Sequence, residues 1–213
     1  MKVIATIILS MLFVSAQLTY TEDEKKYHSA PGTEIKHLDI KELSKARLKV
    51  IDESLKVRME TRWPRYVFGS ADPQKGGFDC SGALYYVLRR AGYGDVPRTS
   101  SDQYLWVKDK GKLRHVSKKA TTLEHRDFRH LKPGDFVFWS GTYKPTDGRK
   151  TSITHIGLYL GKHAGYDKPV MICASKGRYF AGHRQDGYGI YDFKVPSEKS
   201  KSKIVAYGSL HNY

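Results

Sequence analysis

The chain has few cysteines: only Cys80 and Cys173 occur among 213 residues. Two are too few for a disulfide framework or a Cys-rich zinc module, so the fold must depend on apolar packing. Acidic residues are also scarce, with 22 Asp and Glu against 37 Lys and Arg and a net charge of +15. A basic surface suits any anionic polymer. The basic residues are scattered, however, and match no nucleic-acid-binding module, so we expect no nucleic-acid partner.

Long hydrophobic runs are missing as well. The run Val3–Val14 has twelve residues and follows Lys2. A helix of that length spans about 18 Å, short of the roughly 30 Å of a bilayer core. A basic start, a short apolar stretch and the small residues Ser15 and Ala16 are typical of a secretory signal peptide. We therefore predict a signal peptide over 1–16, no transmembrane anchor, and a secreted or periplasmic protein.

The remaining chain is apolar enough to fold, with 39% hydrophobic and 12% aromatic residues. Its patterns predict helices first and strands later, which favours an α+β fold with an antiparallel sheet packed against helices. The expected helices cover 39–61 and Ser81–Ala91. The expected strands are Asp135–Ser140, Ile153–Leu160, Val170–Ser175, Tyr188–Phe193 and Ile204–Leu210. We divide the chain into a leader with a helix over 17–62 and a main domain over 63–213.

Two finer predictions concern individual segments. Leu48, Ile51, Leu55 and Met59 recur at spacings of three and four, and should form the buried face of the first helix. Lys108–His130 is a long polar stretch, for which we expect a connecting loop or a short helix.

Cys80 stands immediately before the second predicted helix. Backbone N–H groups and the helix dipole favour negative charge at a helix start. Such a position is expected to lower the pKa of a thiol and to favour the nucleophilic thiolate. A single cysteine there is weak evidence, because most unpaired cysteines are small buried apolar residues.

His155 lies in an alternating strand. The period of two places His155, Gly157 and Tyr159 on one face, and Ile156, Leu158 and Leu160 on the other. A histidine on the less apolar face, beside a glycine, could accept the proton of a thiol and later protonate a leaving amine. Taken alone, a histidine of this kind is more often a structural residue of a strand.

The surroundings of these two residues carry a resemblance. The sequence reads YVFG at 66–69, FDCSG at 78–82, PRTSSDQ at 97–103, LKPGD at 131–135 and THIGLYLG at 154–161. In this order and spacing the segments, over roughly Trp63 to Ser175, resemble the NlpC/P60 family of papain-like cysteine peptidases. The resemblance implies a papain-like NlpC/P60 fold with the nucleophile at a helix N-terminus.

The resemblance also implies roles for individual residues. Cys80 matches the nucleophile and His155 the base. Tyr66 matches a tyrosine near the oxyanion and the substrate, and Asp79 and Ser81 match residues that hold the amino end of a stem peptide in some members. Arg98 and Gln103 match residues that support the wall of the site, although they could equally serve core packing. The stretch Lys144–Ser152 looks like an insertion that could shape the cleft.

The sequence departs from the family pattern at the third catalytic position. The family usually has His, Asn or Gln there, orienting the base from the next strand, whereas this chain has Cys173. A thiol is a poor hydrogen-bond partner for imidazole. We assign Cys173 to this position, while Ser175, a backbone carbonyl or water could take over the orienting role, or the role could be vacant.

The resemblance implies a secreted endopeptidase that hydrolyses peptidoglycan stem peptides, at a bond between γ-D-glutamate and a diamino acid. The alternative is a weakly active or non-catalytic wall-binding relative, made plausible by Cys173. We expect peptidoglycan or its stem peptides as the partner, a monomer, no cofactor and no metal site.

Overall fold

The computed structural model describes residues 38, 40, 42–61 and 64–211. The predicted signal peptide and the first part of the leader, residues 17–37, lie outside these residues. The described helices are α3 (Lys45–Glu60), α4 (Cys80–Arg90), α5 (Ser100–Lys110) and the short 3-10 helices η1 (Pro73–Lys75) and η2 (Arg126–Phe128). The strands are β1 (Arg65–Tyr66), β2 (Ala71–Asp72), β3 (Gly77–Phe78), β4 (Gly111–His115), β5 (Phe136–Ser140), β6 (Ile153–His163), β7 (Lys168–Phe180), β8 (His183–Asp192) and β9 (Lys203–Leu210).

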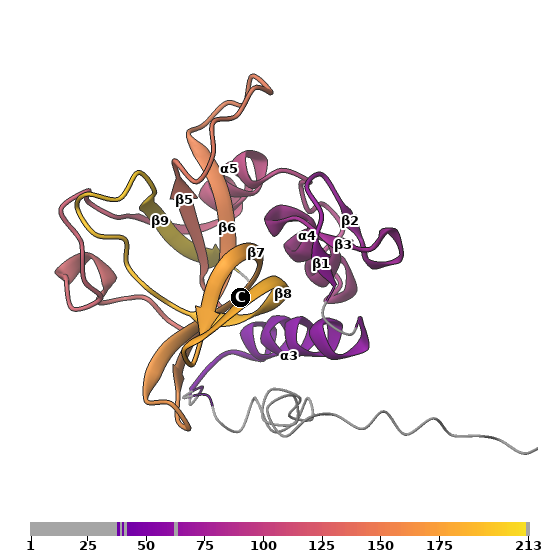
Figure 1. The fold of residues 1–213 in the computed structure, drawn as a ribbon, viewed down its shortest axis with the longest axis horizontal. Helices are drawn as coiled ribbons and strands as arrows, with labels where there is room; N and C mark the ends of the chain where they lie inside the picture. The colour runs from indigo at the N-terminus through magenta and orange to yellow at the C-terminus, as the bar shows by residue number, and fades with distance from the viewer. Residues whose placement is uncertain (1–37, 39, 41, 62–63, 212–213) are drawn as a thin grey trace, which may run out of the picture.

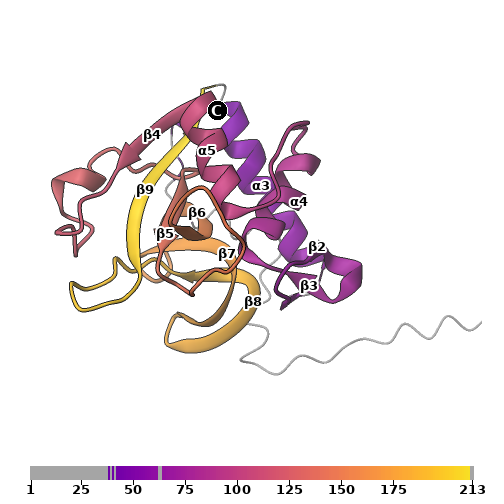
Figure 2. The same ribbon diagram turned by 90° about the horizontal axis from the view of Figure 1, so that it is seen from above.

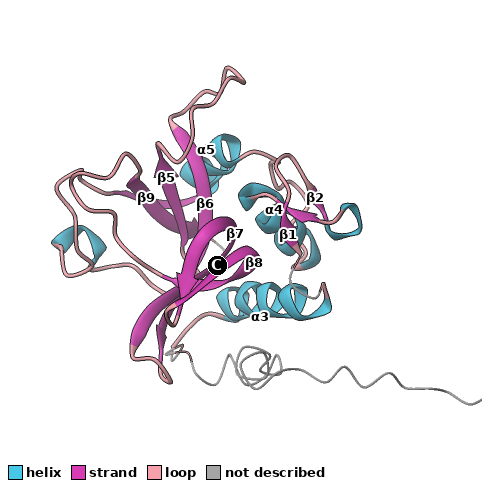
Figure 3. Cartoon of the chain, viewed as in Figure 1, coloured by secondary structure: helices cyan, strands magenta, loops and turns pink. Residues whose placement is uncertain are grey.

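The centre of the molecule is a six-stranded sheet in the order β4-β9-β5-β6-β7-β8, with every neighbouring pair antiparallel. A small second sheet, β1-β3-β2, lies before α4 in the chain. The three α-helices lie together beside the large sheet (Figure 1 and Figure 3). This arrangement confirms the predicted α+β class. None of the described helices is long and apolar enough to cross a membrane.

The two faces of the large sheet are covered differently. The main core cluster joins Ile156, Leu158 and Leu160 of β6 to buried residues of the helices. On the opposite face, Tyr159 belongs to a second cluster, which includes Phe128 from the segment between β4 and β5. That segment lies across the sheet from α3 and α4 (Figure 2). The alternation predicted for β6 is therefore confirmed.

The first helix differs from its prediction at its start and in its buried face. It begins at Lys45 rather than at residue 39, because the Ser44 side chain accepts a hydrogen bond from the Arg47 backbone N–H at 3.3 Å and caps the helix there. Ile51 and Leu55 are buried as expected, but Leu48 is 36% exposed. The buried face is rotated, because the helix packs through Val50, Ser54 and Val57 as well.

The segment expected to be a polar connector is partly regular structure. Its first residues end helix α5, and Gly111–His115 form β4 at the edge of the large sheet, paired with β9. The sequence did contain a signal for α5, because the Thr99 side chain caps its start by accepting from the Asp102 N–H at 3.1 Å. The helix was missed because its polar residues hide the apolar period.

Candidate active site

The start of α4 positions Cys80. Asp79 is the N-cap of the helix, and its carboxylate accepts a hydrogen bond from the Gly82 N–H at 2.6 Å. Cys80 is therefore the first residue of the helix, at the end where backbone N–H groups have no helical partners. Gly82 is required there, because a Cβ on it would come within 2.0 Å of the Ser70 carbonyl oxygen. The close approach of this backbone explains the glycine in the FDCSG segment.

Asp79 also connects the helix to the walls of the site. Arg98 donates to both of its carboxylate oxygens, at 3.0 and 2.8 Å. The Gly69 N–H donates at 2.9 Å and the Ser81 hydroxyl at 3.2 Å. Buried Gln103 donates from its side-chain amide to the carbonyls of Ser81 and Pro97, both at 2.9 Å. Arg98 therefore lines the site, whereas Gln103 is buried behind it and holds the backbone in place, and Asp79 already has several donors.

The Cys80 thiol lies in a dry environment. It is 6% exposed, and burial together with the negative charge of Asp79 raises its pKa to about 12. Backbone groups of Ile156 and Ser81 act in the opposite direction and lower this pKa. The predicted lowering by the helix start is therefore outweighed by burial. The thiol is therefore neutral at pH 7, and it could act as a nucleophile only if a base took its proton.

His155, the predicted base, lies on the strand that borders the thiol. It lies on β6 immediately before Ile156, whose backbone contacts the thiol, and it is 5% exposed. Its ring packs against Trp139 with centroids 5.3 Å apart. Burial and the positive charge of Arg178 hold the pKa of His155 well below its usual value. The imidazole is therefore neutral at pH 7, which is the state that accepts a proton.

The Nε2 atom of His155 is buried and has no hydrogen-bond partner among the described residues. Cys173 lies on the neighbouring strand β7 and is fully buried, in the second cluster with Trp139. A Cβ on Gly157 would come within 3.1 Å of the Cys173 Cβ, so the space beside this glycine is occupied by the cysteine. No hydrogen bond of the described residues joins Cys173 to His155. That Cys173 occupies the orienting position stays a prediction.

Replacing Cys173 tests this prediction. Because Nε2 lacks a partner, Cys173→His should supply one and raise kcat by about two- to tenfold, the rate equivalent of about 0.5–1.4 kcal/mol for one net hydrogen bond. Cys173→Ser should change kcat little. Both are measured by steady-state hydrolysis of a stem peptide, with the melting temperature as a control. A lower kcat for a correctly folded Cys173→His protein would mean that the site is built around the thiol.

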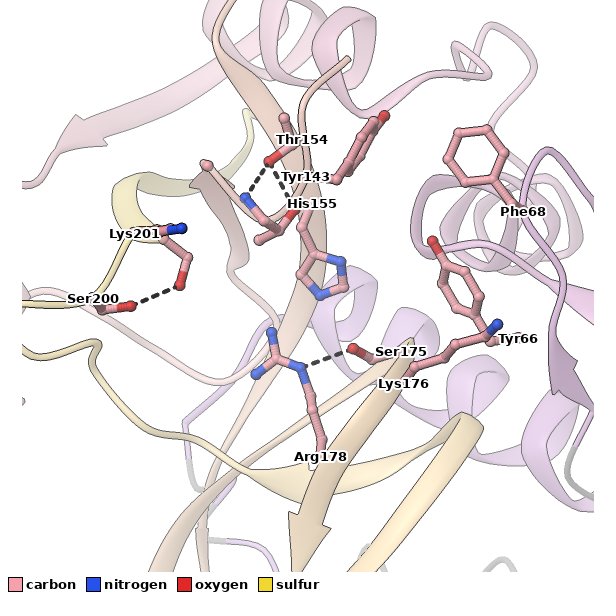
Figure 4. Close-up of a pocket in the computed structure, with 13 residues that line it drawn as sticks. Tyr66, Phe68, Tyr143, Thr154, His155, Ser175, Lys176, Arg178, Ser200 and Lys201 are labelled. Atoms are coloured by element: carbon pink, nitrogen blue, oxygen red, sulfur yellow. Dashed lines mark hydrogen bonds between the residues drawn. The ribbon is translucent and has the colours of Figure 1, made fainter.

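Two adjoining hollows open at the site. The thiol hollow, of about 220 Å³, is lined by Cys80 and by Asp79, Ser81 and Arg98 but not by His155. The imidazole hollow, of about 690 Å³, is lined by His155 but not by Cys80. The two share Tyr66, Phe68, Tyr143 and Thr154. Figure 4 shows the imidazole ring between Tyr66 and Arg178, facing the second hollow.

Several lining residues had no signal strong enough for the sequence to identify them. Tyr143 and Arg149 come from the predicted insertion and its edge, where Arg149 donates to the Tyr143 hydroxyl at 2.5 Å and to Asp147 at 2.6 Å. The expectation that Lys144–Ser152 shapes the cleft is thereby confirmed. Arg178 was missed altogether, because its position depends on an irregularity in β7. The described residues contain no cluster of His, Cys, Asp and Glu able to hold a metal ion.

Known proteins are similar to this chain in sequence. Residues 63–184 match the NlpC/P60 family. A gamma-DL-glutamyl hydrolase of Bacillus subtilis is 36% identical over 96 residues, which are 45% of this chain and 18% of the relative. The murein DD-endopeptidase MepH of Escherichia coli is 28% identical over 151 residues, 69% of this chain and 48% of the relative.

A solved structure of an NLP/P60 family protein from Staphylococcus aureus, similar to a lipoprotein, has a TM-score of 0.48 and 23% identity. The match covers 81% of this chain and 44% of that one. The chain thus spans less than half the length of each of these proteins. Because the family match extends over more than half of the sequence and includes both Cys80 and His155, the chain belongs to the NlpC/P60 family.

Proposed function

We propose that the protein is a cysteine endopeptidase that hydrolyses peptidoglycan stem peptides at the bond between γ-D-glutamate and a diamino acid. The observation that carries this proposal is that the Cys80 thiol, at the start of α4, contacts the backbone of Ile156, which directly follows the neutral, buried His155 on β6. A hollow opens beside each of the two residues. The names of the relatives support the substrate class, since one is a glutamyl hydrolase and another a murein endopeptidase.

In the first half of the proposed reaction, His155 takes the proton of the Cys80 thiol as the sulfur attacks the carbonyl carbon of the scissile amide. The tetrahedral intermediate carries its negative charge on the carbonyl oxygen. The backbone N–H of Cys80 lies at the start of α4, and the Tyr66 hydroxyl shares the site; both are donors suited to this oxygen. The C–N bond then breaks, and protonated His155 returns the proton to the leaving amine.

In the second half, the thioester on Cys80 is hydrolysed. His155 removes a proton from water, whose oxygen attacks the thioester carbonyl. The C–S bond breaks, the substrate leaves with a new carboxyl group, and the proton returns to the sulfur. One water is consumed for each amide bond cleaved, and no metal or cofactor takes part.

The predicted signal peptide fits this proposal. Peptidoglycan lies outside the cytoplasmic membrane, so an enzyme that acts on it must be exported. The sequence signal at 1–16 provides for export, and the excess of Lys and Arg over Asp and Glu would favour an anionic wall. We propose that the mature protein is a secreted or periplasmic monomer.

Turnover of a purified stem peptide tests the proposed activity. The mature protein should release a fragment ending in γ-D-glutamate and a fragment beginning with the diamino acid, which chromatography and mass spectrometry identify. The second candidate, a wall-binding relative without activity, is favoured only by the unpartnered Nε2 of His155. It predicts co-sedimentation with peptidoglycan and no new fragments.

Asp79→Asn tests whether the thiol hollow holds the amino end of the substrate. Removing the carboxylate charge should lower kcat/KM about tenfold for a peptide with a free amino terminus, because an ammonium group loses an ionic partner. The same peptide with an acetylated amino terminus should be affected less. An equal loss on both peptides would assign Asp79 only to capping α4 and holding Arg98.

A further inference from the structure

The imidazole hollow carries positive charge and no negative charge. Lys176, Arg178 and Lys201 line it, and none of its lining residues is Asp or Glu. No carboxylate of the described residues lies within ion-pairing distance of any of these three side chains. Asp186, on the same hairpin as Arg178, instead accepts a hydrogen bond from the Gly177 N–H at 2.5 Å. The hollow is therefore an electrostatic site for an anion that the described chain does not itself supply.

A β-bulge aims Arg178 into this hollow. Ser175 pairs with Gly187, and the next pair is Arg178 with Gln185, so two residues of β7 oppose Asp186 alone. In a regular strand, residues three apart point to opposite faces. The extra residue brings Ser175 and Arg178 to the same side, and bulges of this kind commonly redirect a side chain beside an active site.

The redirected side chain is held in place from two sides. Arg178 Nε donates to the Ser175 hydroxyl at 3.0 Å, and its guanidinium lies 5.5 Å from the centre of the Trp139 ring. These contacts use one of its five N–H donors in a hydrogen bond and leave the terminal nitrogens for a ligand. Figure 4 shows the guanidinium directed toward His155. Lys176 is held over the Tyr66 ring, 5.5 Å from its centre.

The chemistry of the reaction decides which part of a substrate enters this hollow. The base must reach the leaving amine to protonate it, so the amine side of the scissile bond lies on the side of His155. The acyl side lies on the side of Cys80, at the start of α4. The imidazole hollow is lined by His155 and not by Cys80. It therefore receives the amino acid whose amine is released.

Resting on the proposed function, we propose that the imidazole hollow selects meso-diaminopimelate over lysine as the amino acid released, with Arg178, aided by Lys176, binding its side-chain carboxylate. Diaminopimelate is lysine with one additional carboxylate at the end of its side chain, beside the ammonium group. A lysine side chain would bring a lone positive charge into a hollow that already holds three. The extra carboxylate cancels that charge and matches the planar donors of a guanidinium.

Binding of this carboxylate would also assist the base. Burial and, to a smaller extent, the charge of Arg178 hold the pKa of His155 down, which disfavours the imidazolium that forms during the reaction. A carboxylate on Arg178 offsets that charge.

Three tetrapeptides with identical acyl sides test the proposal. Their diamino acid is meso-diaminopimelate, lysine, or diaminopimelate with its side-chain carboxyl amidated. The wild-type protein should show a kcat/KM about 10- to 100-fold higher for the first than for the other two. Arg178→Gln should lower kcat/KM for the diaminopimelate peptide by about 10- to 100-fold. It should leave kcat/KM for the amidated peptide within about threefold of the wild-type value. Arg178→Lys should lose less activity on the diaminopimelate peptide than Arg178→Gln does. Lysine keeps the positive charge but lacks the two parallel N–H donors of a guanidinium.

Arg184→Gln is the matched control, since Arg184 is an exposed arginine on the same hairpin that does not line the hollow. It should change none of the three values. The inference is overturned if wild type cleaves the lysine peptide as well as the diaminopimelate peptide, or if Arg178→Gln lowers all three values equally. The second result would make Arg178 a positioning residue for His155.

If wild type cleaves none of the three peptides, the proposed function fails, and binding then decides the inference separately. Calorimetry with the Cys80→Ala protein should show tighter binding of the diaminopimelate peptide than of its amidated form. The difference should vanish in the Cys80→Ala, Arg178→Gln protein. Equal affinity of the Cys80→Ala protein for the two peptides would overturn the inference.

Discussion

Cys80→Ala is expected to abolish hydrolysis of a stem peptide, with a loss in kcat of at least about 10⁴-fold. The reason is that the covalent route depends on the sulfur, and loss of a nucleophile in comparable acyl-transfer enzymes costs that much or more. The fold should persist, because Ala fits the space of a thiol and leaves Asp79 capping α4. The measurement is single-turnover hydrolysis with a large excess of enzyme, which detects very slow cleavage.

The melting temperature and binding of the intact peptide provide the control. A Cys80→Ala protein that binds the peptide and melts as wild type does, but does not cleave it, has lost only the chemistry. Wild-type turnover in this protein would show that Cys80 is not the nucleophile.

His155→Ala should lower kcat nearly as far, by about 10³- to 10⁴-fold. The pKa of the Cys80 thiol is raised to about 12, so almost no thiolate exists at pH 7 without a base. Raising the pH toward 10 should partly restore activity in this variant, because hydroxide then supplies thiolate in place of the imidazole. Initial rates between pH 6 and 10 for the variant and wild type test both expectations.

His163→Gln is the matched control, since His163 is also a buried histidine of β6 but lies at the other end of the strand. It should retain most of the activity. A normal rate in His155→Ala together with a large loss in His163→Gln would reassign the base.

The positions of Cys80 and His155 in the fold could be predicted from the sequence because the signals are local. FDCSG combines a helix cap, the proposed nucleophile and a glycine required by the nearby Ser70 carbonyl, and all lie within five residues. The strand of His155 alternates regularly, so its two faces follow from counting. The sheet was predictable for the same reason, since its central strands are short apolar runs bounded by turns.

What the sequence could not give depends on contacts distant in the chain. The orientation of Arg178 results from a bulge between β7 and β8, which no local pattern marks. The pKa of Cys80 was predicted in the wrong direction, because the helix start is visible in the sequence whereas complete burial under β6 is not. Helix α5 was missed because it packs through polar residues such as Ser101 and Gln103.

The most direct test of the central claim is digestion of purified peptidoglycan containing meso-diaminopimelate, followed by identification of the soluble fragments by mass. The account predicts new amino termini on diaminopimelate and new carboxyl groups on γ-D-glutamate, released by wild type and not by Cys80→Ala. Fragments cut at another amide bond, or an identical fragment pattern with the two proteins, would contradict it.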